Sequence, residues 1–210
     1  ALDDVIAVSR SRERSGGAAK QSQSTPMGQV TEPEIEIIKR QMERNLNSPL
    51  NSSMGRLFDA VSAMVGIRGE IDYEGQAAVE LEMAAYVCCQ GHLSSVIARS
   101  ARDEAISHNH ESYPYHIIED KGIRIIQLGE LLLAIIEDLK RGIPSGKISL
   151  QFHNTVAQMI NEMCQAIANE TGITQVALSG GVFQNRLLLT KTVNLLESNG
   201  FQVFTHRQAP

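Results

Sequence analysis

The residues best suited to chemistry lie near the end of the chain, in residues 176–189, VALSGGVFQNRLLL. Gly180 and Gly181 follow a short apolar run, and glycine lets a ligand approach the backbone closely because it has no Cβ. A helix that begins at Asn185 presents free N–H groups and a positive dipole end, which suit a phosphate or another anion. Asn185 can also donate and accept hydrogen bonds, as a ribose or a base edge requires. A purely structural strand-to-helix turn explains the same glycines, so both interpretations stay open.

A second candidate pair, Gly55 and Asp59, lies in residues 47–66, NSPLNSSMGRLFDAVSAMVG. The two residues are four apart on a predicted helix and therefore share one face. A carboxylate above the notch left by a glycine can accept hydrogen bonds from the vicinal hydroxyls of a ribose. The alternative is that Asp59 is an ordinary solvated or salt-bridged helix residue.

Glu74 and Gln76 stand in residues 72–78, DYEGQAA, where a loop is expected to enter a helix. Polar residues are common at helix starts, so a structural role is the default interpretation of both.

The histidines give weaker signals than these blocks. His108 and His110 are two apart in a polar segment that lacks the third and fourth ligands of a metal site. His153 is interpreted as a hydrogen-bonded interface residue in a long helix rather than as a base. The sequence shows no partner for three others, His92, His116 and His206. We therefore assign no metal ligand and no catalytic residue.

Composition narrows the classes of function. The chain has 210 residues, with 19 Lys and Arg against 24 Asp and Glu, and this net charge of −5 argues against nucleic-acid binding. The three cysteines form no CxxC pair, which fits reduced thiols in a cytoplasmic protein. Apolar runs fall short of the ~20 residues that cross a bilayer, so we expect a soluble protein without a membrane partner. Motifs of serine hydrolases, P-loop ATPases and Rossmann enzymes are absent from the sequence.

The elements that must position these residues follow from hydrophobic periodicity. Helices are predicted over residues 33–46, 55–65, 75–91, 129–142, 147–169 and 185–198, and strands over residues 113–118, 122–127, 173–178 and 201–205. The longest helix has one apolar stripe, formed by Ile148, Phe152, Val156, Met159, Ile160, Met163 and Ile167. The helix over residues 75–91 has a stripe of mostly small residues, which permits close packing: Ala77, Leu81, Ala84, Ala85 and Cys88.

The last strand, helix and strand form a βαβ unit, which implies a parallel pair with a right-handed crossover. Residues 1–31 are rich in Ser, Gly, Gln and Arg, and we interpret them as a flexible or disturbed segment. Residues 32–210 are interpreted as part of one domain.

Order and spacing resemble a known family in four blocks: LNSPLNSSMGRLFDAVSAMVG, YEGQAAVELE, KISLQFHNTVAQMI and VALSGGVFQNRLLL. Together with GFQVFTHRQAP, they are similar to the C-terminal catalytic region of the HypF hydrogenase-maturation carbamoyltransferases, over about residues 32–210. The resemblance implies an α/β fold of the sugar kinase/actin/heat-shock ATPase superfamily. The chain would hold mostly the second lobe of that fold, rich in helices and with a short mixed sheet.

The resemblance also implies a chemistry. In that family carbamoyl phosphate and ATP give a carbamoyl-adenylate, whose carbamoyl group passes to the C-terminal cysteine of the partner HypE and becomes a cyanide ligand of the nickel–iron centre. By the same resemblance Gly55 and Asp59 hold the ribose, and Asn185, after Gly180 and Gly181, contacts the nucleotide. Glu74 and Gln76 would lie at the rim of the cleft, with no role assigned.

The chain departs from the family pattern at both ends. The family's histidine cluster for a metal ion would lie upstream, and its aspartate ligand belongs to a PNDGG block expected directly after Pro210. We interpret the chain as truncated at both ends, with the metal ligands of the parent enzyme outside it, and do not expect it to catalyse alone. Two alternatives stay open: a non-enzymatic remnant that acts as a binding module and, ranked last, a TsaD-like tRNA threonylcarbamoyl transferase.

Overall fold

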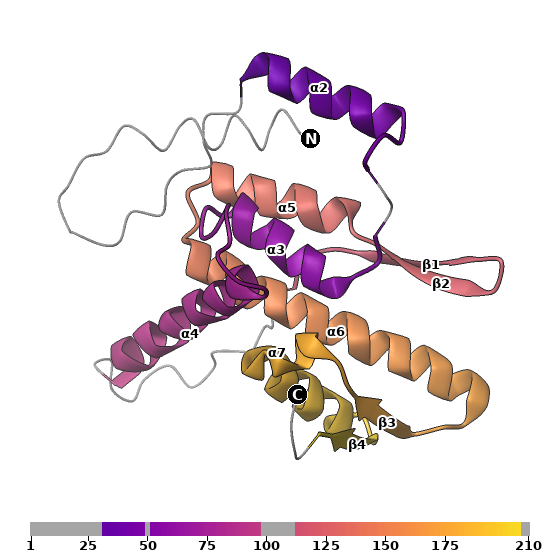
Figure 1. Ribbon diagram of the computed structural model, residues 1–210. Coiled ribbons are helices and arrows are strands. Elements are labelled where there is room, and N and C mark those ends of the chain that lie inside the picture. Colours follow the sequence, from indigo (N-terminus) through magenta and orange to yellow (C-terminus); the bar gives the residue numbers. More distant parts are fainter. Residues whose placement is uncertain (1–30, 49–50, 98–111, 207–210) are drawn as a thin grey trace. The chain divides into compact units, whose positions relative to one another are not determined.

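The computed structural model describes residues 31–48, 51–97 and 112–206 (Figure 1). The chain divides into two compact units, Ala1–Glu80 and Leu81–Pro210, and the boundary falls within a helix. The segment predicted to be flexible, residues 1–31, lies outside the described residues except for Thr31. Within the described ranges, no helix combines the length and the apolar character needed to span a membrane.

The first unit begins with α2 (Glu32–Glu43). At its start the Glu34 carboxylate accepts hydrogen bonds from the N–H and the hydroxyl of Thr31, at 2.7 and 2.8 Å. The sequence predicted a helix that reaches residue 46, and this end was wrong. The helix stops at Glu43 because Asn45 takes a left-handed backbone conformation with a φ of 52°.

Helix α3 (Met54–Met64) follows, as predicted, and buries Phe58 and Val61 in the first unit. Helix α4 (Gln76–Ile97) begins in the first unit and continues into the second. Its predicted stripe of small residues is confirmed in the part of α4 that belongs to the second unit. A Cβ at Gly146 would stand 2.6 Å from the carbonyl oxygen of Ala84, so only glycine fits this helix crossing.

The second unit contains an antiparallel hairpin of β1 (His116–Asp120) and β2 (Ile123–Gln127). Lys121 and Gly122 both have positive φ, as a tight two-residue hairpin turn requires. The first strand begins three residues later than predicted. Tyr113, the expected first residue, makes other contacts instead of strand pairs. Its N–H donates to the Thr155 hydroxyl at 2.8 Å, and its phenol donates to a carboxylate of α5 at 2.9 Å.

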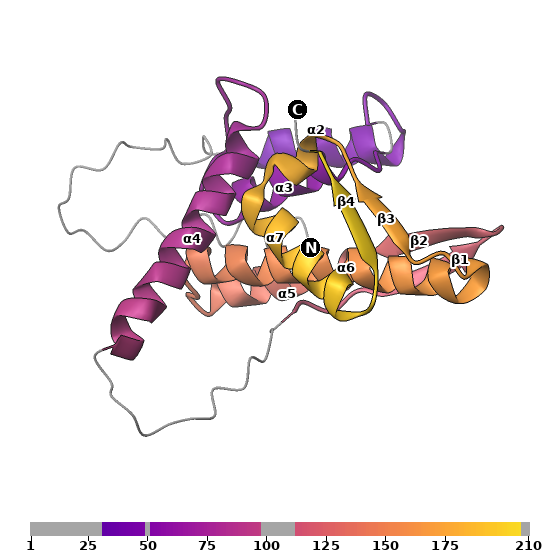
Figure 2. The same cartoon turned by 90° about the horizontal axis from the view of Figure 1, so that it is seen from below.

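Helices α5 (Gly129–Lys140) and α6 (Ser145–Thr171) form the core of the second unit. Figure 2 shows them side by side, with α7 (Arg186–Ser198) along the other part of α6. The predicted stripe of α6 is buried in its first half, and Ile167 near its end is 43% exposed. The fully buried side chains here include Leu131, Ile135, Ile148, Phe152, Val156 and Met159.

The predicted βαβ unit is confirmed. Strand β3 (Gln175–Leu178) leads through the short 3₁₀ helix η2 (Gly181–Gln184) into α7, and β4 (Gln202–Thr205) returns parallel to β3. Leu178, Leu196 and Phe201 form its small core. The strands of the described residues form two separate two-stranded sheets, one antiparallel and one parallel, where the sequence predicted a short mixed sheet.

Candidate functional site

The turn after β3 contains both candidate glycines. Gly180 has a φ of 102°, which a residue with a side chain rarely adopts, so the turn itself requires glycine there. Gly181 has no such backbone requirement, and no described atom lies within 4 Å of a Cβ placed on it. Neither packing nor strain in the described residues explains glycine at this exposed position, which leaves room for a ligand.

A contact beside this turn escaped the sequence analysis. The Ser179 hydroxyl lies 2.8 Å from Nε2 of His206, a histidine for which the sequence showed no partner. The signal was available in the predicted parallel pair. Leu178 is opposite Thr205, so the residues that follow each strand meet at the same edge of the sheet. His116 also has a partner that the sequence did not show, a carboxylate oxygen of Glu130 at 3.1 Å.

Asn185 caps α7 and is 9% exposed. Its Oδ1 accepts a hydrogen bond from the N–H of Leu188 at 2.8 Å, and its Nδ2 lies 2.9 Å from Nε2 of His153. Within the described part of the chain, neither contact uses the second N–H of the amide nitrogen. Asn185 therefore uses its Oδ1 and one N–H of Nδ2 in contacts within the fold, and the second N–H of Nδ2 remains as a donor.

The N–H groups of α7 are less available than the sequence predicted. The Leu187 N–H donates to a carboxylate oxygen of Glu82 at 2.9 Å, and the Leu188 N–H is capped by Asn185. These two groups are therefore not free for an anion. For these two groups the prediction was wrong, because α4, distant in sequence, brings a carboxylate to the helix start, where the helix dipole favours negative charge.

His153 is fully buried on α6. Its Nδ1 lies 2.7 Å from the carbonyl oxygen of Ser149, and its Nε2 contacts Asn185. Burial lowers its pKa from 6.5 to about 4, while the Ser149 carbonyl raises it and the Lys191 charge lowers it further. This lowered pKa favours the neutral ring at physiological pH, and the contacts of both ring nitrogens confirm the predicted hydrogen-bonded interface residue.

In the first unit, Gly55 and Asp59 lie on α3, four residues apart on one face. The nearest atom to a Cβ at Gly55 would be the Ser53 hydroxyl at an ordinary 3.6 Å, so the described fold does not require glycine there. The Asp59 side chain is 30% exposed, and Oδ2 lies 3.4 Å from Nη1 of Arg56. This ion pair agrees with the salt-bridged interpretation of Asp59 and leaves its other oxygen for a ligand.

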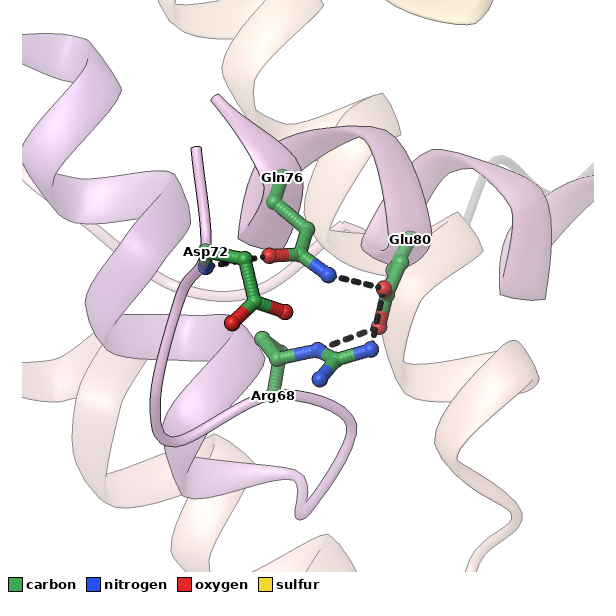
Figure 3. Close-up of polar contacts among 4 residues, drawn as sticks. All are labelled: Arg68, Asp72, Gln76 and Glu80. Carbon is green, nitrogen blue, oxygen red and sulfur yellow. Dashed lines mark hydrogen bonds and ion pairs between the residues drawn. The ribbon is translucent and has the colours of Figure 1, made fainter. Parts of the chain in front are cut away.

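Gln76 is buried, and both ends of its amide make hydrogen bonds, as Figure 3 shows. Its Oε1 accepts from the Asp72 N–H at 2.7 Å, and its Nε2 donates to Glu80 at 3.0 Å. Arg68 binds the same carboxylate through two nitrogens, at 2.9 and 2.5 Å. We call Arg68, Asp72, Gln76 and Glu80 the clamp. It ties the loop before α4 to that helix, which supports a structural role for Gln76, whereas Glu74 is exposed.

The clamp also shifts two pKa values. The hydrogen bonds from Arg68 lower the pKa of Glu80, against a smaller opposing effect of burial. The same contact with Glu80 raises the pKa of Arg68. Both groups are charged over the physiological pH range, so the clamp is an ion pair with two additional hydrogen bonds, one to the Glu80 carboxylate and one between neutral groups.

The described residues contain no group of three or more His, Cys, Asp or Glu side chains that could hold a metal ion. His108 and His110, considered above as metal ligands, lie outside the described residues. The side chains present thus do not fit the metal ion that the family resemblance implies, and we assign no step to it.

Comparisons with known proteins identify the family of this chain. The family model described as carbamoyltransferase, Kae1-like domain, second subdomain, matches residues 6–210. The carbamoyltransferase HypF of Synechocystis is 31% identical over 172 residues, which cover 81% of this chain and 19% of the relative. The probable carbamoyltransferase HypF of Methanocaldococcus jannaschii is 27% identical over 180 residues, covering 86% of this chain and 20% of the relative. The chain thus spans only a small part of the length of these relatives.

Two solved structures share the fold. A full-length HypF in its phosphate- and nucleotide-bound form is 37% identical, with a TM-score of 0.72 over 88% of this chain and 26% of that one. The HypF of T. kodakarensis is 25% identical, with a TM-score of 0.63 over 97% of this chain and 22% of that one. These matches confirm the predicted α/β fold and the resemblance given above. The chain belongs to the HypF carbamoyltransferase family, in the second subdomain of its Kae1-like domain.

Proposed function

We propose that residues 32–210 are the nucleotide-facing part of an ATP-dependent carbamoyltransferase of hydrogenase maturation. The observation that carries this proposal is the match of nearly the whole chain, residues 6–210, to the carbamoyltransferase subdomain. The proposed nucleotide contacts are Gly55, Asp59, Gly180, Gly181 and Asn185.

Geometry supports this choice of residues at two positions. Glycine within a helix is generally less favourable than alanine, yet Gly55, half-buried in the first turn of α3, has no tight contact that would require it. Gly181 likewise faces open space. Ligand approach explains glycine at both positions, because a Cβ would narrow the space that a ribose or phosphate needs.

In the proposed reaction, the longer protein converts carbamoyl phosphate, water and ATP to a carbamoyl-adenylate in the cytoplasm, with release of phosphate and pyrophosphate. The C-terminal cysteine of a HypE-type partner then attacks the carbamoyl carbon. A carbon–sulfur bond forms, the bond to the phosphate oxygen of AMP breaks, and the thiol proton is released. The bound phosphate and nucleotide of the homologous HypF support the use of these substrates. For the residues of this chain we propose only that they bind and orient the nucleotide.

Nucleotide binding can be tested by titrating ATP into the isotope-labelled 210-residue chain while its amide NMR spectrum is recorded. We expect shifts at Gly180 and Gly181 and at the side-chain amide of Asn185, and weaker binding in D59A and N185A. The matched control is D120A, which removes an exposed carboxylate from the end of β1. Absence of site-specific shifts at millimolar ATP, or equal binding by all four proteins, would contradict the proposed site.

A second test concerns the whole reaction. The 210-residue chain, mixed with carbamoyl phosphate, ATP and a HypE-type protein, should give no carbamoylated cysteine by mass spectrometry. The chain spans only 19% and 20% of two carbamoyltransferase relatives, and the proposed first step belongs to the longer protein. Turnover by this chain alone would contradict the proposal that it only binds and orients the nucleotide.

A further inference from the structure

The inference concerns His153, which contacts Asn185 but lies too deep to meet a ligand, since its side chain is fully buried. Its Nδ1 is 2.7 Å from the carbonyl oxygen of Ser149. A carbonyl oxygen can only accept, so Nδ1 must carry the proton of the neutral ring. The other ring nitrogen, Nε2, is then an acceptor.

The tautomer of the His153 ring decides the orientation of the Asn185 side chain. Because Nε2 accepts, the group 2.9 Å away must be the amide nitrogen of Asn185. Oδ1 then faces the Leu188 N–H, 2.8 Å away. A half-turn of the carboxamide would set two acceptors against each other at His153 and two donors at Leu188. Both hydrogen bonds would be lost, so only one orientation is compatible with the neutral ring.

Two further hydrogen bonds link this network to α4. The Ser149 hydroxyl donates to the carbonyl oxygen of Leu81 at 2.6 Å, and the Glu82 carboxylate accepts from the Leu187 N–H at 2.9 Å. We call Ser149, His153, Asn185 and Leu188 the relay. The relay connects α6 to the start of α7, directly after the turn that contains Gly180 and Gly181.

We propose that His153 is a positioning residue, which holds the Asn185 carboxamide in one orientation so that its remaining N–H and the glycine turn are set for the nucleotide. The inference rests on the proposed function for its ligand, but the orientation itself needs no ligand. His153 acts through Asn185 and touches neither the nucleotide nor the reacting atoms.

The test compares two amide substitutions of His153 that differ in reach. In H153Q the side-chain oxygen lies near the former Nε2 and can accept from Asn185. In H153N the shorter side chain reaches the Ser149 carbonyl and leaves Asn185 without an acceptor. A control variant, Q165A, removes a side-chain hydrogen bond between α6 and Asn199, at the far end of α7.

The first readout is NMR of the 210-residue chain without nucleotide. The wild-type ring should show the Nδ1–H tautomer. The side-chain signals of Asn185 and the amide of Leu188 should move in H153N and stay close to wild type in H153Q and Q165A. The inference is overturned if the ring is the Nε2–H tautomer, or if H153N leaves these signals unchanged.

The second readout is ATP affinity, measured by the same titration at a temperature where all variants are folded. H153N should bind about tenfold more weakly, as expected for loss of one oriented hydrogen bond, and H153Q should recover most of the loss. If His153 had only a structural role, H153N and H153Q would lose ATP affinity to the same extent, in proportion to their loss of thermal stability. Equal affinity of wild type and H153N overturns the inference while the proposed function stands. If wild type binds no ATP, the proposed function fails and the ligand-free readout alone decides on His153.

Discussion

The clamp of the first unit and the relay of the second solve the same structural problem with opposite chemistry. Each ties a loop to the start of a helix, α4 in one case and α7 in the other. The clamp uses a charged pair, Arg68 and Glu80, whose side chains are 28% and 27% exposed. The relay is centred on His153, which is neutral and has no exposure.

The difference follows from access to water. Charged groups that keep some contact with solvent avoid most of the desolvation cost, so an ion pair is tolerable in the clamp. A buried ring would be costly as an ion, and it is compatible with the fold only as a neutral group with both nitrogens paired. The two networks should therefore respond differently to acid, to substitution and to salt.

Acidification should separate them with the largest effect. Unfolded His153 takes up a proton near pH 6.5, whereas the folded ring does so only near pH 4. Between these values the unfolded state binds more protons, so the free energy of unfolding falls as the pH is lowered, by roughly 3 kcal/mol in full. The pKa of Glu80 is already lowered from 4.5, so the clamp loses its contribution only below that pH.

Urea unfolding at pH 7 and pH 5 measures the effect of the relay before the clamp titrates. The H153Q variant lacks the titrating ring and should lose clearly less stability between these two pH values than wild type. An identical loss in the two proteins would show that His153 is not buried as a neutral ring.

Removal of Asn185 should have the next largest effect. N185A deletes the cap of α7, which contributes about 1 kcal/mol, and leaves Nε2 of His153 unpaired, so we expect a total loss of about 2–3 kcal/mol. N185S keeps a capping hydroxyl but does not reach His153, so it should lose about half as much. Chemical denaturation of the three proteins measures this, and equal stability of N185S and N185A would assign the whole effect to His153.

Packing beside the relay gives a smaller effect. Gly146 lies one turn before Ser149, and a Cβ there would be 2.6 Å from the Ala84 carbonyl oxygen and 3.2 Å from Cys88. We expect G146A to destabilise the chain by about 1–2 kcal/mol, although alanine favours helices. The control G129A adds a methyl group at a helix position with open space around it and should be neutral or slightly stabilising. Thermal unfolding of both variants tests whether α4 and α6 are in close contact.

The elements of the fold were largely predictable because their signals are local. The βαβ unit follows from two apolar runs around a helical pattern, and the end of α6 follows from Gly172, which takes the left-handed conformation. The strand expected from residue 113 began later because Tyr113 is held by Thr155 and Asp138, contacts that no periodicity contains. The end of α2 was missed because two asparagines take positive φ, which sequence allows but does not require.

The sequence singled out candidate site residues but not the contacts that they make. Gly180, Gly181 and Asn185 were singled out from their spacing, and their use for a nucleotide stays a proposal. Glu82 and His153 became relevant only through the fold, since they are 105 and 32 residues from the groups that they contact. A polar residue on a helix has many candidate partners at such separations, and only packing selects among them.

Loss of the clamp charge should have the smallest effect, and salt should identify it. E80Q keeps an oxygen for Arg68 but removes the charge, so its melting temperature should fall by less than that of N185A. The difference in melting temperature between wild type and E80Q should shrink in high salt. At about 1 M salt the Debye length is about 3 Å, which weakens partly exposed pairs. E70Q neutralises an exposed glutamate of the same loop and is the matched control. The N185A defect should be insensitive to salt, because it involves neutral buried groups. A salt-independent E80Q defect would mean that the clamp works as a set of hydrogen bonds like the relay, and the contrast between the two networks would disappear.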